Sequence, residues 1–438
     1  MRVRALTCAA MMACAALAAT TRTTTALGRP GITPVPCPTQ EWQPGDPAFE
    51  ALPGAKAFFG RYEGGIYKIE IPDHWNGELV LYAHGFVSNA GAQGSTLRVG
   101  NSPIREHQIK EGYAWAASSY RCNGYVPGQG LLDTMALTDL FTKANGGRAP
   151  QRTYLTGTSM GGHVALLGMH EFPTTFVGGL AMCPAGPELF DFFAATAGAA
   201  EVITGVTTKL DTMAADLAKM NEMLGKAPDY TDKGRQLASV EIHISGGPRP
   251  FAMEGLASGG RFAGNISPGA LAGSTTPSNR AVMTTQFNYA IDAGLGLTAD
   301  ALNQGARRKA LDAGMRDPKG PYDELVPFDG KLERPTLTMH GTGDLFVPIF
   351  LEQSLKRAVV AAGRESLLAQ RIYRIAGHCG FSQPEMIRSF DDLTAWVHRG
   401  ARPAGDEVFG DLSNAGMTFT NPLRPGDPGG IRATAAKH

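Results

Sequence analysis

The chain has 438 residues, of which 43% are hydrophobic and 18% charged, and its 40 basic and 40 acidic residues give a formal net charge of zero. This composition is ordinary for a globular protein with a large core. No long basic run occurs, so nothing in the sequence indicates binding to nucleic acid or to an anionic membrane surface. The 55 glycines and 29 prolines indicate many loops.

The N-terminus has the pattern of a secretory signal peptide. Arg2 and Arg4 precede an apolar run over residues 5–19, and a threonine-rich stretch ends near Ala26. The apolar run is short for a membrane span of about 20 residues, although an N-terminal anchor is the alternative. We predict a signal peptide over 1–26, cleaved near Ala19 or Ala26, and a secreted or periplasmic protein that has no membrane contact after cleavage.

Export changes the interpretation of the cysteines, because Cys8 and Cys14 would leave with the signal peptide. The four that remain are Cys37, Cys122, Cys183 and Cys379. An even number in an oxidising compartment predicts two disulfides, with three possible pairings, and buried free thiols are the alternative. No C-x-x-C spacing occurs, so we expect no metal site.

Residues 27–57 are rich in proline and glycine and predict an irregular arm. Strand and helix patterns alternate after it, which indicates βαβ units and a mostly parallel sheet over 58–186. The predicted strands are 65–71, 78–83, 113–118, 152–155 and 175–182, and the predicted helices are 104–111, 131–144 and 162–171.

The alternation stops over 187–330, where apolar residues at helical spacing predict one amphipathic helix near 210–224. We interpret this region as an inserted cap or lid. The βα pattern resumes over 331–400, with strands at 335–339 and 371–375 and a helix near 384–399. Residues 401–438 predict an irregular tail. The fold class is therefore α/β, with helices flanking a mostly parallel sheet and a large cap.

Residues 157–161 spell G-x-S-x-G between a predicted strand and a predicted helix. The glycines let the strand turn sharply into the helix, which exposes the hydroxyl of Ser159. A serine hydroxyl is a weak nucleophile without a base, so a histidine oriented by a carboxylate must accompany it. A structural glycine-rich turn is the alternative interpretation.

The acid and the base are expected in loops after late strands, in the order serine, acid, histidine. Asp344 follows the strand 335–339, and His378 follows the strand 371–375. Because the carboxyl ends of parallel strands lie on one edge of a sheet, the three groups are predicted to meet there. The alternatives do not fit this order: His340 precedes the acid, His398 lies on the last helix, and Asp323, Glu324 and Asp329 precede the strand.

An oxyanion hole needs two backbone N–H donors near the serine. One is predicted at Met160, directly after Ser159. The other is predicted at Phe86, in the loop after the strand 78–83. His84 precedes this donor, and a hydrogen bond within the loop is its expected role.

Four segments together resemble the α/β-hydrolase superfamily: LVLYAHGF at 79–86, GTSMGG at 157–162, HGTGDLFVP at 340–348 and GHCGF at 377–381. The resemblance covers about 58–186 and 333–399. It implies a Ser159–Asp344–His378 triad, an acyl-enzyme intermediate and no cofactor or metal. It does not identify the substrate.

One detail is similar to tannases and feruloyl esterases, whose pattern joins a cysteine beside the catalytic serine to a cysteine beside the histidine. Cys379 follows His378 as in that pattern, but Thr158 precedes Ser159. Cys183 takes the missing position in our hypothesis and pairs with Cys379. Cys37 then pairs with Cys122.

Substrate contacts are predicted from Phe190 in the cap and from Tyr120 and Arg121 in the loop after 113–118, with core packing and loop bracing as the alternatives. The predicted activity is hydrolysis of a small-molecule or polymeric carboxylic ester. One alternative is an aminopeptidase-type serine peptidase, in which acidic residues of the cap bind the free amino terminus of the substrate. The other is a non-catalytic binding protein. The oligomeric state is not determined by the sequence.

Overall fold

The computed structural model describes residues 37, 43–45, 48–89, 94–209, 211–258, 279–317 and 319–420. The predicted signal peptide, most of the predicted N-terminal arm and residues 421–438 of the predicted tail lie outside the described residues. Within the described part of the chain, no helix has the length and apolar character needed to cross a membrane.

An eight-stranded sheet forms the centre of the protein, in the order β12-β11-β8-β7-β4-β6-β3-β2. Strands β2 and β3 run antiparallel at one edge, and the pairs from β6 to β12 are parallel. This confirms the expected α/β-hydrolase fold with its mostly parallel sheet. The strands are β2 (Ala55–Tyr62), β3 (Gly65–Pro72), β4 (Glu78–Ala83), β6 (Ala114–Ser118), β7 (Arg152–Thr158), β8 (Gly178–Met182), β11 (Thr336–Gly341) and β12 (Leu368–Tyr373).

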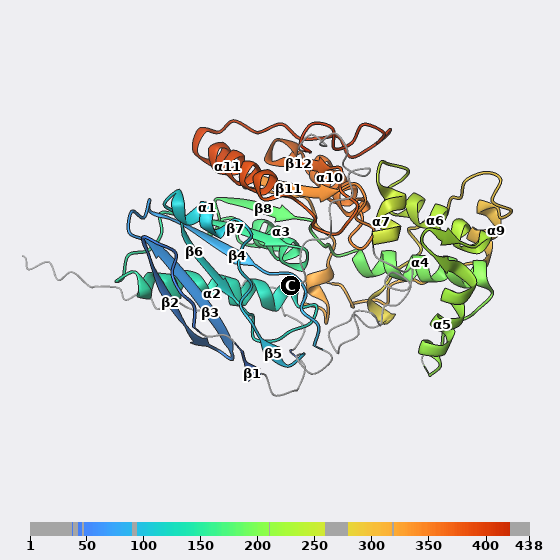
Figure 1. The fold of residues 1–438 in the computed structure, drawn as a ribbon, viewed down its shortest axis with the longest axis horizontal. Coiled ribbons are helices and arrows are strands. Elements are labelled where there is room, and N and C mark those ends of the chain that lie inside the picture. The colour runs from blue at the N-terminus through green and yellow to red at the C-terminus, as the bar shows by residue number, and fades with distance from the viewer. Residues whose placement is uncertain are drawn as a thin grey trace, which may run out of the picture.

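Helices cover both faces of this sheet (Figure 1). Successive side chains of a strand point to opposite faces, so Leu79 and Leu81 of β4 pack in one buried cluster and Val80 in another. The first cluster includes residues of α2 (Pro127–Ala144), α3 (Met160–Glu171) and α10 (Phe350–Ala361), and the second includes residues of α1 (Arg105–Lys110) and α11 (Gln383–Arg399). Burial on both faces explains why these strands are almost continuously apolar.

The region predicted as a cap contains several helices that gather at one side of the sheet domain (Figure 1). They are α4 (Leu189–Thr204), α5 (Met213–Leu224), α6 (Asp232–Ile244), α7 (Ala252–Ser258) and α9 (Ala299–Gly305), with short 3₁₀ turns η2 (Asn279–Ala281) and η3 (Asp323–Leu325). The predicted amphipathic helix corresponds to α5. Its role as part of a cap, and the domain boundaries, remain predictions.

Some predicted boundaries need correction. Strand β2 begins at Ala55, inside the segment predicted as irregular, and it pairs with β3 in a hairpin. Helix α2 begins at Pro127, four residues earlier than predicted, because proline is well suited to the first turn of a helix. Helix α10 was not predicted. The remaining short elements are β1 (Gln43–Pro44) paired with β5 (Thr96–Leu97), β9 (Gly225–Lys226) paired with β10 (Asp229–Tyr230), and η4 (Glu365–Leu367).

Candidate active site

Ser159 lies in the turn between β7 and α3, with φ 60° and ψ −120°. A left-handed φ is unfavourable for a residue with a side chain. Close backbone packing makes the turn specific to glycine at its flanks: a Cβ on Gly157 would lie 1.9 Å from the Gly161 oxygen, and one on Gly161 would lie 2.0 Å from the Ala83 oxygen. The G-x-S-x-G sequence is therefore required by the geometry of this turn.

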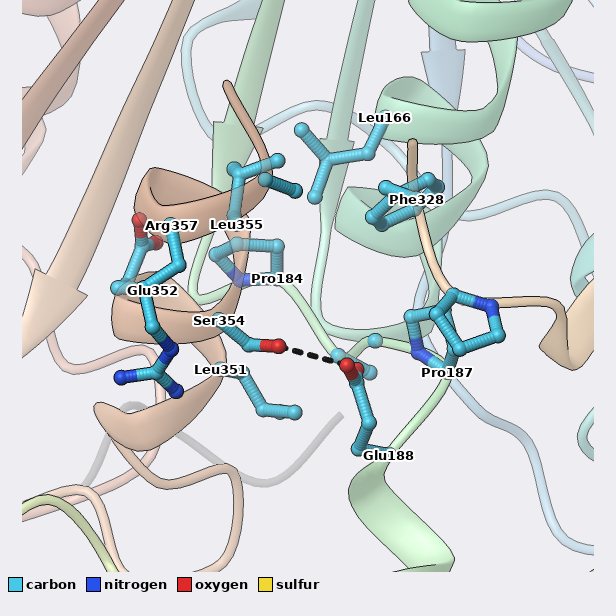
Figure 2. Close-up of a pocket in the computed structure, with 14 residues that line it drawn as sticks. Leu166, Pro184, Pro187, Glu188, Phe328, Leu351, Glu352, Ser354, Leu355 and Arg357 are labelled. Carbon is cyan, nitrogen blue, oxygen red and sulfur yellow. Dashed lines mark hydrogen bonds between the residues drawn. The ribbon is translucent and has the colours of Figure 1, made fainter. Parts of the chain in front are cut away.

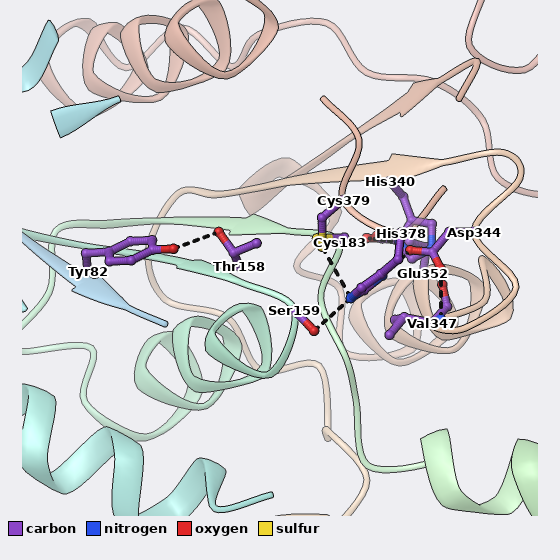
Figure 3. Close-up of a disulfide and its surroundings, with 10 residues drawn as sticks. All are labelled: Tyr82, Thr158, Ser159, Cys183, His340, Asp344, Val347, Glu352, His378 and Cys379. Carbon is purple, nitrogen blue, oxygen red and sulfur yellow. Dashed lines mark hydrogen bonds and ion pairs between the residues drawn. A yellow bond between two sulfur atoms is a disulfide. The ribbon is translucent and has the colours of Figure 1, made fainter. Parts of the chain in front are cut away.

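The structure brings Ser159, His378 and Asp344 together at the carboxyl ends of β7, β12 and β11 (Figure 3). Ser159 Oγ lies 2.8 Å from His378 Nε2, and His378 Nδ1 lies 2.6 Å from Asp344 Oδ2. Asp344 is fully buried, whereas the His378 side chain is one-quarter exposed. The imidazole therefore connects a buried carboxylate to a hydroxyl at the open edge of the sheet.

The loop after β4 lies against the nucleophile turn. A Cβ on Gly85 would be 3.8 Å from Ser159 Oγ, which places the backbone leading into Phe86 beside the serine. Met160 is the first residue of α3, so its N–H belongs to the first turn of the helix, where N–H groups have no intrahelical acceptor. Both predicted oxyanion donors thus belong to segments that adjoin Ser159.

His84 holds this loop in shape. Its Nδ1 donates to the Gly85 carbonyl oxygen at 2.7 Å, and its ring stacks on Tyr120 with centroids 4.0 Å apart. Burial lowers the pKa of His84, so the ring is neutral near pH 7. This agrees with the loop hydrogen bond that the sequence predicts for His84.

Both predicted disulfides, Cys37–Cys122 and Cys183–Cys379, are present in the structure. The second joins the end of β8 to the residue after His378, and Cys379 Sγ lies 3.3 Å from His378 Nε2. Cys183, His378 and Cys379 form the cluster of potential metal-binding side chains found among the described residues. Their sulfurs are bonded to each other, so they offer no thiolate to a metal.

The three predicted substrate contacts have other roles in this structure. Arg121 donates to Asp133 at 2.6 Å and to Glu63 at 2.8 Å, so its charge is already paired. Tyr120 is fully buried and donates its hydroxyl to the His84 carbonyl oxygen. Phe190 is buried against Tyr125, with ring centroids 4.9 Å apart. Arg121 therefore braces its loop, whereas Tyr120 and Phe190 pack in the core. These are the alternative roles given for the three side chains above.

Sequence analysis missed Phe346, whose ring meets the ring of His378 edge-on with centroids 5.4 Å apart. It also missed Val347, whose N–H donates to Asp344 Oδ1 at 2.9 Å. Both belong to the HGTGDLFVP segment. Their position directly after Asp344 was the available signal, but their orientation depends on the folded loop.

The residues considered as alternative acids and bases are not part of the Ser159–His378–Asp344 series, and most of them have other partners. His398 contacts Glu78 at 2.9 Å, and Asp329 pairs with His170 and Lys331. Glu324 accepts the N–H of Gly128. His340 is buried, and its Nε2 contacts the Val347 carbonyl oxygen at 2.8 Å.

A pocket of about 370 Å³ lies between the loop after β8 and helix α10 (Figure 2). Pro184, Pro187 and Phe328 form part of its wall, and Ser354 Oγ donates to Glu188 Oε1 across it at 2.6 Å. Ser159, Asp344 and His378 are not among its lining residues. The pocket is therefore separate from the candidate active site.

No protein-family model matches this chain, and no curated protein sequence matches it. Solved structures that it resembles include feruloyl esterase B from Aspergillus oryzae, with a TM-score of 0.42 and 13% identity over 80% of this chain and 82% of that chain. Another is an esterase from Aspergillus oryzae, with a TM-score of 0.43 and 12% identity over 81% and 88% of the two chains.

A third is the acylaminoacyl peptidase of Pyrococcus horikoshii, with a TM-score of 0.38 and 11% identity over 82% of this chain and 44% of that chain. Identities and TM-scores this low carry no information about which bond this chain would cleave. The order and direction of its strands, and the sharp turn that presents Ser159 between a strand and a helix, are features of its own structure. By those features this chain has the α/β-hydrolase fold.

Proposed function

We propose that this chain is a serine hydrolase that cleaves carboxylic esters through an acyl-enzyme intermediate. The observation that supports the proposal is the hydrogen-bonded series from Asp344 through His378 to Ser159, with distances of 2.6 and 2.8 Å. A nucleophile within hydrogen-bond reach of a base, which is itself oriented by a third group, is the arrangement that activates a serine hydroxyl.

In the proposed reaction, His378 Nε2 takes the proton of Ser159 Oγ as the oxygen attacks the ester carbonyl carbon. Asp344 accepts the Nδ1–H and stabilises the imidazolium that forms. His378 then gives the proton to the leaving alcohol as the ester C–O bond breaks. A water molecule repeats the sequence on the acyl-enzyme, which releases the acid and restores the serine.

The negative charge on the carbonyl oxygen needs donors that are already in place. The backbone N–H groups of Met160 and Phe86 are proposed for this role, because both segments adjoin Ser159. Loss of one such donor costs about 10²–10³ in rate in serine hydrolases that have been tested by substitution. Phe346 packs its ring edge-on against the His378 ring.

Hydrolysis of p-nitrophenyl esters from acetate to palmitate, with wild type and Ser159→Ala compared directly, tests the proposal. We expect turnover by the wild type and a loss of about 10⁶-fold in kcat for the variant, as for removal of the serine in comparable triads. Equal activity in both proteins would mean that Ser159 is not the nucleophile. The dependence on acyl chain length would measure the size of the acyl site.

The peptidase alternative predicts turnover of aminoacyl amides and little turnover of acyl esters. Two of the cap acids available to such an enzyme have partners in this structure: Glu201 pairs with Arg307, and Asp216 accepts from Thr212. A panel of aminoacyl p-nitroanilides, assayed beside the ester series, distinguishes the two.

Location outside the cytoplasm is proposed together with the activity. Two disulfides support it, because such bonds persist in oxidising compartments. Cell fractionation and N-terminal sequencing of the mature protein would test both the compartment and the cleavage site.

A further inference from the structure

A second titratable pair lies behind the acid of the candidate site. His340, on β11, and Glu352, on α10, are both buried, and His340 Nδ1 lies 3.4 Å from Glu352 Oε1. The other carboxylate oxygen of Glu352 accepts hydrogen bonds from Thr338 Oγ1 at 2.7 Å and Gln370 Nε2 at 2.5 Å. These donors come from two neighbouring strands, and they orient the carboxylate so that Oε1 faces the imidazole.

The pair is connected to the candidate active site through the backbone of Val347, whose carbonyl and N–H groups both take part. His340 Nε2 donates to the carbonyl oxygen of Val347 at 2.8 Å. The N–H of the same residue donates to Asp344 Oδ1 at 2.9 Å, and Asp344 Oδ2 accepts from His378. Figure 3 shows His340, Glu352 and Val347 gathered close to Asp344. Val347 thus accepts a hydrogen bond from His340 through its carbonyl oxygen and donates one to Asp344 through its N–H.

The contacts of His340 determine its protonation. Both ring nitrogens face oxygen acceptors, Glu352 on one side and the Val347 carbonyl on the other, which suits an imidazolium with a proton on each nitrogen. Burial lowers the pKa of His340, but Glu352 and the more distant Asp344 outweigh burial, so that the pKa is raised overall. Arg249 is a further charged group beside this loop, and it donates to the Thr342 carbonyl oxygen at 2.6 Å.

We propose that His340 and Glu352 are positioning residues for Asp344: through Val347 they fix the carboxylate in the orientation that His378 requires. This inference rests on the proposed function. It assigns a catalytic consequence to a pair that touches neither Ser159 nor a substrate. If the pair only stabilised the fold, its loss would lower the free energy of unfolding without changing the chemistry of molecules that remain folded.

Three substitutions separate these possibilities. His340→Leu removes both contacts of the ring. His340→Gln keeps an N–H donor near the position of Nε2, so it retains the contact with Val347 but loses the charge. Glu352→Gln keeps the shape of the carboxylate and removes its charge. Glu188→Gln is the matched control, because Glu188 accepts a hydrogen bond from the hydroxyl of Ser354, as Glu352 does from that of Thr338, but does not pair with His340.

Steady-state kinetics with a p-nitrophenyl ester, and the rate of labelling by a fluorophosphonate, are measured at a temperature where each variant is folded. For His340→Leu we expect kcat and the labelling rate to fall about 10–100-fold with KM within about twofold, since small displacements of catalytic groups cost up to about 10² in rate. His340→Gln should recover most of the loss. Glu352→Gln should displace the acid limb of the pH profile of kcat/KM, and Glu188→Gln should leave it unchanged.

A double-mutant cycle shows whether the pair acts through Asp344. In an Asp344→Ala background, His340→Leu should cause no further loss of kcat. An equal loss in both backgrounds, or a kcat of His340→Leu within twofold of the wild type, would overturn the inference. Should His340→Leu fail to fold, Glu352→Gln decides it, since a pH profile of kcat/KM for Glu352→Gln that coincides with that of the wild type would contradict the inference. A wild type that neither turns over nor labels would instead refute the proposed function.

Discussion

Backbone packing around the turn at Ser159 leaves no room for a side chain on Gly161. Gly161 lies so close to the end of β4 that a Cβ there would meet the Ala83 oxygen at 2.0 Å, a distance that only movement of the backbone could relieve. Side-chain contacts can adjust, but Ala83 is the last residue of β4 and its position is fixed by its pairing with Gly157 of β7. The requirement for glycine at this position is therefore structural as well as catalytic.

We expect Gly161→Ala to lower the free energy of unfolding by at least about 3 kcal/mol, the upper end of the cost of overpacking. Gly186→Ala is the control, because a Cβ there would make its nearest contact at 3.4 Å, an ordinary van der Waals distance. It should cost less than about 1 kcal/mol. Denaturant unfolding of both variants measures the difference, and similar losses would contradict the packing argument.

At the scale of single residues, local sequence predicted the groups whose position follows from a turn or a strand end. Ser159, Asp344 and His378 each follow a strand, and the parallel sheet brings such positions together. The role of Arg121 was left open by the sequence, since its partners Asp133 and Glu63 come from other elements. Side-chain partners of that kind depend on tertiary packing, which a single sequence does not reveal.

Among the elements, helix α4 is joined by a buried ion pair to the segment between α9 and η3. Arg316 donates two hydrogen bonds to Asp191, and both side chains are almost completely buried. Asp191 also accepts the N–H of Met283. Burial raises the pKa of Asp191 even though Arg316 opposes this, so the carboxylate depends on its partner to remain charged.

Arg316→Met should therefore destabilise the protein by about 3–5 kcal/mol, because it leaves a buried carboxylate without its cation. Arg280→Met is the matched control: Arg280 pairs with Asp312 nearby, but its side chain is 69% exposed. An exposed pair contributes about 0–1 kcal/mol. Thermal and denaturant unfolding compare the two, and a loss for Arg316→Met as small as that for Arg280→Met would refute the assignment.

The regular elements of the sheet were predictable because their apolar patterns are strong. The elements near the cap were harder. Helix α4 buries residues on all sides, including Phe190, Phe192 and Phe193, so it lacks the one-sided apolar pattern that identified α5. Strand β2 was missed because its residues are only partly buried, although its partner β3 follows it directly in a hairpin, with paired residues 3 to 17 positions apart in the sequence.

On the scale of the whole molecule, two histidines, His163 and His170, make the free energy of unfolding depend on pH in opposite directions. Burial lowers the pKa of His163 to about 3, and Tyr125 lies 2.9 Å from its Nδ1. Burial also disfavours charge on His170, but Glu171 and Asp329 outweigh it and raise its pKa. The stabilisation from His170 is complete below its unfolded pKa and is lost as the pH rises through the folded pKa.

For His163 the sign is reversed. Below its unfolded pKa of about 6.5 the unfolded chain binds a proton that the folded protein does not, so acid favours unfolding. Between pH 7 and pH 5 the wild type should lose about 2 kcal/mol more unfolding free energy than His163→Gln. Comparison with the variant removes the contribution of His170, which both proteins share. A difference that does not change with pH would contradict the neutral, buried state of His163.

The central claim is that the folded protein activates the hydroxyl of Ser159. The most direct measurement is labelling of the native protein with a fluorophosphonate, followed by peptide mapping by mass spectrometry. We predict one adduct, on the peptide that contains Ser159, which forms far more slowly in His378→Gln and is absent from Ser159→Ala. Labelling at another residue, or a folded wild type that does not react, would contradict the account.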